Sequence, residues 1–251
     1  MTRFPLRTGS GSTGVISAPS GAPRFHEASI GAVTNARYDG LSEWYEATLL
    51  GDPLVPDTAS RLLGPPQGRL LDVGCGTGFH TVRFAEAGWS AVGVDPSDDQ
   101  LRLARGRGLE VVRGRGEELP FEDGEFDAAV SLWTHTDVED FATVCRETAR
   151  VLKPGAAFVY VGAHPCFVGP HSLFVAGEGI PELHPGWYRR TGRYEDAPGV
   201  TPDGLRVRVG AVHLPLAEFL QAFLEAGFTL ERVEEPGDRE YPHVVAIRCR
   251  R

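Results

Sequence analysis

The sequence predicts a doubly wound α/β fold, in which helices cover both faces of a mainly parallel sheet. Short apolar runs of strand length alternate with helix-length stretches of 3.6-residue periodicity from residue 69 onward. A glycine-rich stretch stands where the first of these strands meets the first helix. The 251 residues are enough for one full-size α/β domain, and we expect one domain that carries an insertion.

The order of the elements follows from the apolar pattern. We expect strands at residues 69–74, 90–95, 109–113, 126–131, 156–161, 228–233 and 244–248. We expect helices of this alternation at residues 79–87, 97–106, 138–151 and 216–226. Helices of this length are the usual crossovers between parallel strands.

Three segments stand apart from this alternation. Residues 1–24 are rich in Gly, Ser, Thr and Pro without apolar periodicity, which is typical of a flexible arm. The α/β domain is expected at residues 25–251, and its first part, 25–64, has the apolar spacing of helices that cover the main fold. Residues 163–212 break the rhythm with many glycines, prolines, histidines and aromatics, which indicates a lid or substrate-binding insertion.

The composition disfavours several classes of protein. The 34 acidic and 25 basic residues give a net charge of −9, which makes nucleic acid a poor partner. No run approaches the roughly 18 consecutive apolar residues of a membrane span, and no apolar core of a signal peptide is present, so we expect a cytoplasmic protein without membrane contact. The four cysteines form no C-x-x-C pair, so we expect neither a metal site nor a disulfide framework.

The glycine-rich turn runs from Gly74 to Gly78 and reads G-C-G-T-G. Glycines at such a turn let a ligand approach the backbone closely. Dinucleotide-binding turns have glycine at the first, third and sixth positions, whereas this turn has its third glycine at the fifth position and Phe79 at the sixth. Asp95 ends the next strand roughly 20 residues on, where a carboxylate can accept both hydroxyls of a ribose. The turn therefore predicts a nucleoside-containing cofactor, and its spacing disfavours a dinucleotide.

An ordered set of motifs extends this pattern. It consists of L-L-D-V-G-C-G-T-G at 70–78, V-G-V-D at 92–95, G-E-E-L-P-F-E-D-G-E-F-D at 116–127 and V-L-K-P-G at 151–155. The set resembles the class I S-adenosylmethionine-dependent methyltransferases, in particular their small-molecule, type 11 subfamily. The resemblance covers residues 70–161 and implies a Rossmann-like seven-stranded sheet of order 3-2-1-4-5-7-6, whose last strand is antiparallel.

The resemblance also implies which residues hold S-adenosylmethionine. Asp72, the backbone amides of Gly74 to Gly78, and Ser131 and Leu132 after the fourth strand would face its methionine end. Asp95 would hold its ribose, and the residues after the third strand would contact its adenine. The family often has Gly-Asp-Ala before the acidic pair, whereas this chain has Gly114-Arg115-Gly116, which puts the adenine contact in doubt. The expected cofactor-binding residues are Tyr38, Asp72, Gly74, Cys75, Gly76, Gly78, Asp95, Pro96, Gly116, Glu117, Ser131 and Leu132.

Methyl transfer requires alignment of the nucleophile more than a metal or a covalent residue, although a general base helps a hydroxyl or amine acceptor. His135 is the first candidate because it follows the fourth strand at the sheet edge, and His164, after the fifth strand, is the second. His135 can instead be a cofactor-facing or loop-packing histidine, and Pro165 beside His164 favours a turn residue there.

The expected function is methyl transfer to an O, N or C atom of a small molecule, plausible in secondary metabolism. The alternative is a non-methylating reaction, such as a cyclisation, for which the bound cofactor is the scaffold. The expected partner is the small-molecule acceptor, and the protein is expected to be a monomer or a homodimer.

Overall fold

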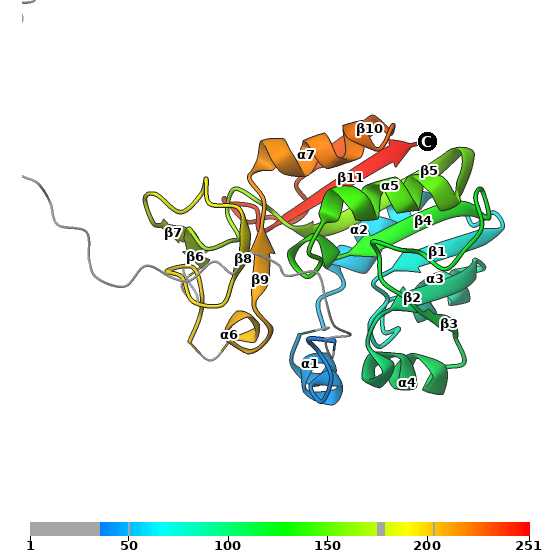
Figure 1. The fold of residues 1–251 in the computed structure, drawn as a ribbon, viewed down its shortest axis with the longest axis horizontal. Coiled ribbons are helices and arrows are strands. Elements are labelled where there is room, and N and C mark those ends of the chain that lie inside the picture. The colour runs from blue at the N-terminus through cyan, green and yellow to red at the C-terminus, as the bar shows by residue number, and fades with distance from the viewer. Residues whose placement is uncertain (1–35, 50, 175–178, 203) are drawn as a thin grey trace, which may run out of the picture.

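The computed structural model describes residues 36–49, 51–174, 179–202 and 204–251. The expected flexible arm, residues 1–24, and the start of the expected cover region therefore lie outside the described residues. Figure 1 shows the main sheet at the centre of the molecule, with the inserted segment at one end of it.

A seven-stranded mixed sheet forms the centre of the fold, in the order β10-β11-β5-β4-β1-β2-β3. β1, β2, β3, β4 and β5 pair in parallel, whereas β11 is antiparallel to both β5 and β10. The predicted strand order is thus confirmed. The strands are β1 (Arg69–Val73), β2 (Ser90–Asp95), β3 (Glu110–Arg113), β4 (Phe126–Leu132), β5 (Leu152–Ala163), β10 (Thr229–Glu234) and β11 (Val244–Arg250).

Two apolar clusters lie on opposite faces of this sheet. Successive strand residues point to opposite faces, so Leu70 belongs to one cluster and Leu71 to the other. One face is covered by α2 (Leu54–Leu63) and α3 (Thr81–Ala87), and the other by α5 (Phe141–Val151) and α7 (Leu216–Glu225). Two further helices, α1 (Ser42–Leu49) and α4 (Asp98–Gly106), contact each other, and α4 packs against β2 and β3.

The start of α5 differs from the sequence-based expectation of residue 138. A short 3₁₀ helix, η1 (Thr134–Thr136), follows β4, and α5 begins only at Phe141. Asp140 determines this start, because its carboxylate accepts a hydrogen bond from the Thr143 amide at 3.0 Å and so caps the helix.

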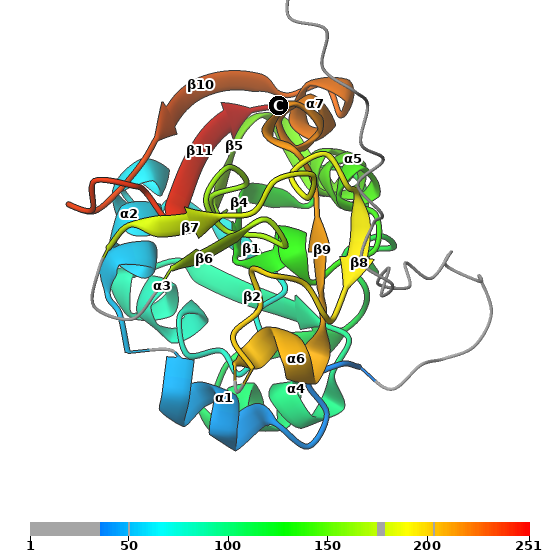
Figure 2. The same ribbon diagram turned by 90° about the vertical axis from the view of Figure 1, so that its left-hand side faces the viewer.

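The inserted segment is more regular than the expected loop. It contains two small antiparallel sheets, β6 with β7 and β8 with β9, and a short helix between β8 and β9 (Figure 2). Strands of three residues are too short to leave a period in the sequence, which explains why they were not predicted. Of these elements, β9 packs against η1, which follows β4 in the main fold. The elements are β6 (Ser172–Phe174), β7 (Pro181–Leu183), β8 (Gly192–Tyr194), α6 (Leu205–Val209) and β9 (Ala211–His213).

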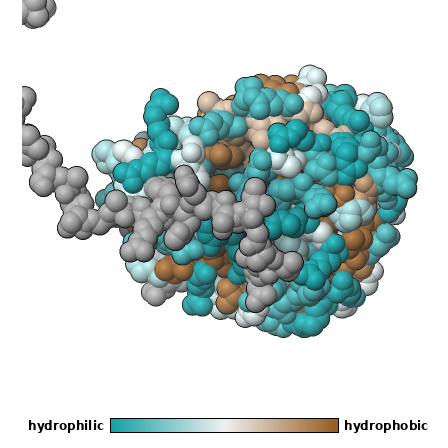
Figure 3. Space-filling model, in the orientation of Figure 1, coloured by the Kyte–Doolittle hydropathy of each residue, from teal (hydrophilic) through white to brown (hydrophobic). Residues whose placement is uncertain are grey.

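The surface is mainly hydrophilic, with small hydrophobic patches, on the part of the face in Figure 3 that is drawn in colour. Among the described residues, five large hydrophobic side chains are exposed, and such isolated residues are normal on soluble domains. None of the helices in the described part of the chain has the length and apolar character needed to cross a membrane.

An aromatic cluster between α5, α7 and β5 should contribute much of the stability. The Phe219 ring is fully buried, and it stacks on Phe141 with ring centroids 5.4 Å apart. Phe219→Ala should lower the free energy of unfolding by about 3–5 kcal/mol because it leaves a cavity in a packed core. Leu224→Ala, on the same helix but 49% exposed, should change it by less than about 0.5 kcal/mol. Urea denaturation measures both, and losses of similar size would contradict the assignment.

Candidate functional site

The carboxyl ends of β1, β2 and β4 meet at one edge of the sheet. From β1 the chain continues to β2 and β3 on one side, and then returns to β4 on the other side of β1. Ligands of open α/β sheets bind at such a reversal of strand order. The glycine turn follows β1, Asp95 ends β2, and Ser131 and Leu132 end β4, so the structure brings these predicted residues to one edge.

The glycine turn is held by the end of β2. The amides of Gly74 and Cys75 both donate to the Val94 carbonyl, at 2.8 and 3.1 Å, and the amide of Gly78 donates to the Cys75 carbonyl at 2.9 Å. The amide of Gly76 donates to Asp95 Oδ2 at 3.0 Å. These four amides therefore already have partners within the protein, which differs from the expectation of amides directed at a ligand.

The three glycines of the turn serve different purposes. All have positive φ: +77° at Gly74, +54° at Gly76 and +73° at Gly78. A Cβ at Gly74 would lie 2.3 Å from Thr134 Cγ2, and one at Gly78 would lie 2.5 Å from Leu109 Cδ1, so both positions are needed for packing. At Gly76 the nearest described atom would be Gln100 Oε1 at 3.4 Å. Gly76 is therefore where the missing side chain leaves room for a ligand.

Asp95 lies beside Gly76 with its carboxylate fixed. Its Oδ2 accepts from Gly76 and its Oδ1 accepts from the Ser97 amide at 2.9 Å. Burial raises the pKa of Asp95 to about 6, against the effect of these two amides. The residue is only partly buried by surface area, so its oxygens can still accept hydrogen bonds from a ligand.

Asp72 lies beneath the turn and is 2% exposed. Its Oδ2 accepts a hydrogen bond from the hydroxyl of Thr81, the first residue of α3, at 2.6 Å. Its Oδ1 is buried without a partner among the described residues. Burial raises the pKa of Asp72 to about 7. The carboxyl group thus anchors α3 with one oxygen and leaves the other for a hydrogen-bond donor.

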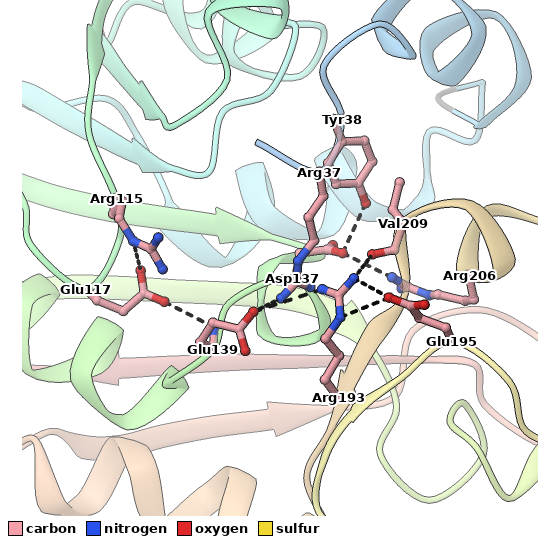
Figure 4. A network of polar contacts seen from close by, with 10 residues as sticks. All are labelled: Arg37, Tyr38, Arg115, Glu117, Asp137, Glu139, Arg193, Glu195, Arg206 and Val209. Atoms are coloured by element: carbon pink, nitrogen blue, oxygen red, sulfur yellow. Dashed lines mark hydrogen bonds and ion pairs between the residues drawn. The ribbon is translucent and has the colours of Figure 1, made fainter. Parts of the chain in front are cut away.

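The residues after β3 contact the loop after β4. The Glu117 carboxylate accepts from the Glu139 amide at 3.1 Å and forms an ion pair with Arg115 (Figure 4). A Cβ at Gly116 would lie 3.1 Å from Val144 Cγ2, so this glycine allows close packing on α5. The Pro96 carbonyl, one residue after β2, accepts from Arg113 Nε at 3.4 Å. The predicted contacts of these residues with adenine stay predictions.

The end of β4 is strained and buried. Trp133 has φ +64°, the only positive φ of a non-glycine residue in the described ranges. Such backbone strain concentrates at functional sites. The Ser131 hydroxyl donates to the Val73 carbonyl at 3.0 Å and also contacts the Thr134 hydroxyl, and Leu132 is buried. The Ser131 hydroxyl therefore joins β4 to β1 rather than facing open space.

His135, the first candidate for a general base, lies inside the aromatic cluster. It is 1% exposed, its Nδ1 contacts the Tyr160 hydroxyl, and its ring packs against those of Phe141 and Phe219. Burial, assisted by the charge of Arg206, lowers the pKa of His135 to about 3. Its predicted role as a base stays a prediction, and this environment favours a packing role instead.

His164 forms part of a turn after β5. Its Nε2 lies 2.9 Å from Glu235 Oε1, and its Nδ1 accepts from the Cys166 amide at 3.1 Å. Burial lowers its pKa, although Glu235 opposes this effect. Both ring nitrogens are thus occupied, in agreement with the alternative of a turn histidine.

The loop after β4 brings together two segments that are far apart in the sequence. Tyr38, from the segment before α1, donates its hydroxyl to Asp137 Oδ1 at 3.1 Å. Arg206, from α6 of the insertion, donates to the same oxygen at 3.1 Å and to the Thr136 hydroxyl at 2.8 Å. Figure 4 shows Tyr38 and Arg206 approaching Asp137 from these two elements. We call the three residues Tyr38, Asp137 and Arg206 the roof cluster.

A second set of ion pairs surrounds the roof cluster. Glu139 pairs with Arg37 on the N-terminal side and lies 4.0 Å from Arg193 of β8 (Figure 4). Arg193 also pairs with Glu195 at 2.7 Å. The N-terminal segment, the loop after β4 and the insertion therefore join over the same edge of the sheet.

Sequence reasoning missed Asp137 and Arg206. Asp137 follows the fourth strand by five residues and could have been considered as an acid at the sheet edge. Arg206 lies in an insertion without periodicity, so the sequence offers no signal for its contact with Asp137. Within the described residues, no three His, Cys, Asp or Glu side chains group suitably for a metal ion.

Comparison with known proteins gives consistent matches. Residues 71–160 match the family described as "Methyltransferase domain". A demethylmenaquinone methyltransferase of Corynebacterium kroppenstedtii is 39% identical over 124 residues, 47% of this chain and 54% of the relative. A fatty-acid O-methyltransferase of Mycolicibacterium smegmatis is 37% identical over 103 residues, 39% of this chain and 38% of the relative. The chain spans about half the length or less of these two curated relatives.

A solved structure extends the match to most of the chain. An S-adenosylmethionine-dependent methyltransferase from Mesorhizobium loti has a TM-score of 0.65 and 26% identity, over 85% of this chain and 99% of that one. Residues 71–160 thus match a methyltransferase domain, and the fold is that of the class I S-adenosylmethionine-dependent methyltransferases.

Asp72 should make stability depend on pH. Its pKa is about 7 in the folded protein and near 3.8 in an unfolded chain, so the folded state binds the proton more tightly. The free energy of unfolding should therefore fall as pH rises, by about 3 kcal/mol from pH 5 to pH 8. Asp72→Asn should remove this part of the dependence, as measured by urea denaturation at both pH values.

The control for this prediction is Asp57→Asn, because Asp57 is exposed and pairs with Arg83. This variant should keep the pH dependence of the unaltered protein. Parallel stability curves for the Asp72→Asn variant and the unaltered protein would refute the assignment.

Proposed function

We propose that the protein transfers a methyl group from S-adenosylmethionine to an O, N or C atom of a small molecule. The observation that carries this proposal is the junction of Gly76 with Asp95 at the reversal of strand order. A glycine that leaves space and a fixed, accessible carboxylate lie side by side there, as a ribose and its neighbouring atoms require.

The buried polar atoms fit the same cofactor. The oxygens of Asp95 can accept hydrogen bonds from two ribose hydroxyls, and the free Oδ1 of Asp72 can accept one from an ammonium group such as that of the methionine end. Gly76 gives the cofactor room to approach the turn. When bound, the cofactor supplies a methyl group activated by its positive sulfur.

The remaining task of the protein is to align the acceptor and exclude water, since the displacement needs no covalent residue. The roof cluster suits this task because it joins the insertion and the N-terminal segment above the cofactor edge. These contacts between the insertion and the N-terminal segment are made by side chains, which can separate. An acceptor can enter when they do.

Two findings support a small molecule as the acceptor. The matched relatives are named as demethylmenaquinone and fatty-acid methyltransferases, and the net charge of −9 disfavours nucleic acid. The narrower form of this proposal is that the acceptor is a secondary metabolite. The alternative, a cyclisation on a cofactor scaffold, is supported only by the shared fold of the cyclase SpnF, which has a TM-score of 0.55 and 19% identity.

Cofactor binding is the direct test. S-adenosylmethionine and S-adenosylhomocysteine should bind in calorimetric titrations, and Asp95→Ala should weaken both by tenfold or more, because the hydrogen bonds of a partly buried carboxylate to the ribose are lost. Asp98→Ala is the matched control, since Asp98 is an exposed acid three residues away and should leave affinity within about twofold. Micromolar binding of NAD in place of these ligands would refute the proposal.

Methyl transfer separates the two candidate functions. Incubation with methyl-labelled S-adenosylmethionine and small-molecule extracts should yield a labelled product. An unlabelled, rearranged product formed without consumption of the methyl donor would support the cyclisation instead.

A further inference from the structure

Asp137 is a carboxylate that the sequence-based candidates did not include, and one of its oxygens is firmly held. Oδ1 accepts from both the Tyr38 hydroxyl and Arg206, each at 3.1 Å. Two donors from different segments fix the position of the carboxylate. The side chain is only partly buried, so it keeps access to whatever occupies the edge of the sheet.

The second oxygen of Asp137 has one weak hydrogen-bond partner in the part of the chain that the structure describes. Among the described residues its only hydrogen-bond donor is the Thr136 hydroxyl at 3.4 Å, which is long for a hydrogen bond between a hydroxyl and a carboxylate. A fixed carboxylate with one free oxygen is the arrangement that a proton acceptor needs.

Asp137 also lies close to the predicted cofactor edge. Burial is the main cause that raises the pKa values of Asp95 and Tyr45, and the negative charge of Asp137 raises both further. The same charge acts on Tyr194, which is nearly buried in the insertion. The charge of Asp137 thus acts on groups from β2, α1 and β8.

We propose that Asp137 is the carboxylate that faces the reacting methyl group and receives the proton of the acceptor. This inference rests on the proposed methyl transfer. It assigns the base to a residue of the roof cluster rather than to His135, whose ring is enclosed by aromatic side chains.

The step balances in atoms and charge. A lone pair on the acceptor atom forms the new bond to the methyl carbon, and the bond from carbon to sulfur breaks with its electron pair retained by sulfur. The proton of the acceptor passes to Asp137 Oδ2 and leaves to solvent after product release. The positive sulfur and the negative carboxylate become neutral together, so no net charge is created in a site with limited water.

The test uses two ligands that differ by one methyl group and one positive charge. S-adenosylmethionine and S-adenosylhomocysteine are titrated calorimetrically into the unaltered protein and into Asp137→Asn, and the ratio of the two affinities is compared. The variant loses the attraction between the Asp137 carboxylate and the positive sulfur several ångströms away. Its preference for S-adenosylmethionine over S-adenosylhomocysteine should therefore be about tenfold lower than that of the unaltered protein. Glu139→Gln, a carboxylate-to-amide change in the same loop, should keep the ratio within about twofold.

Each outcome decides a separate question. If Asp137→Asn binds both ligands with an unchanged ratio, the carboxylate does not face the sulfur, and this inference is wrong while the proposed function stands. If the unaltered protein binds neither ligand, the proposed function itself fails. Asp137→Ser serves if the asparagine variant does not unfold cooperatively, and the same change of ratio is expected.

The base role has its own readout in acceptors of graded acidity. With methyl-labelled donor, Asp137→Asn should lose at least a hundredfold in transfer to 4-methoxyphenol, which must give up a proton at pH 8. Transfer to 4-nitrophenol, which is mostly ionised at that pH, should fall much less. Equal losses on the two phenols, or transfer by the unaltered protein to the carboxylate of octanoate alone, would overturn the proton-acceptor role.

Discussion

The arrangement of the candidate site depends on two hydrogen bonds to the carbonyl of Val94. It accepts hydrogen bonds from two consecutive amides, those of Gly74 and Cys75, and so turns the chain immediately after β1. This turn brings Gly76 to Asp95 and starts α3 above Asp72. Because an added Cβ at Gly74 would overlap Thr134, the turn also fixes the distance between β1 and the loop after β4. The Val94 carbonyl near the end of β2 thereby fixes the relative positions of the ends of β1, β2 and β4.

The carboxylates at this edge are held in an environment that disfavours their charge. Burial raises the pKa of Asp72 to about 7 and that of Asp95 to about 6, so the unliganded protein carries a cost in stability near neutral pH. Ligand donors to these oxygens would offset that cost. Sites that bind ligands commonly retain such local destabilisation, and the buried aromatic cluster around Phe219 supplies stability elsewhere.

The sequence predicts the parts of the fold that depend on local periodicity. The strands and the four helices of the alternation follow from apolar spacing. The order of the strands followed from the resemblance to the class I methyltransferases, and the structure confirms it. The short strands of the insertion were not predicted, because β6 to β9 have three residues each and their pairing depends on tertiary contacts.

Only the residues of the candidate site that directly follow predicted strands could be predicted from the sequence. Gly76 and Asp95 are adjacent to strands that the sequence defines, so their meeting followed from topology. The environment of His135 did not, because its enclosure depends on Phe219, which is 84 residues away in the chain. The contact between Asp137 and Arg206 spans 69 residues and leaves no trace in composition or spacing.

The separate hydrogen bonding of the insertion has a consequence for how the protein could diverge. None of β6, β7, β8 and β9 pairs with a strand of the main sheet. The backbone ladder that supports the glycine turn is therefore complete without them. Under the proposed function, substitutions or length changes in the insertion would reshape the acceptor side while the cofactor side kept its geometry, so the two halves of the site could evolve at different rates.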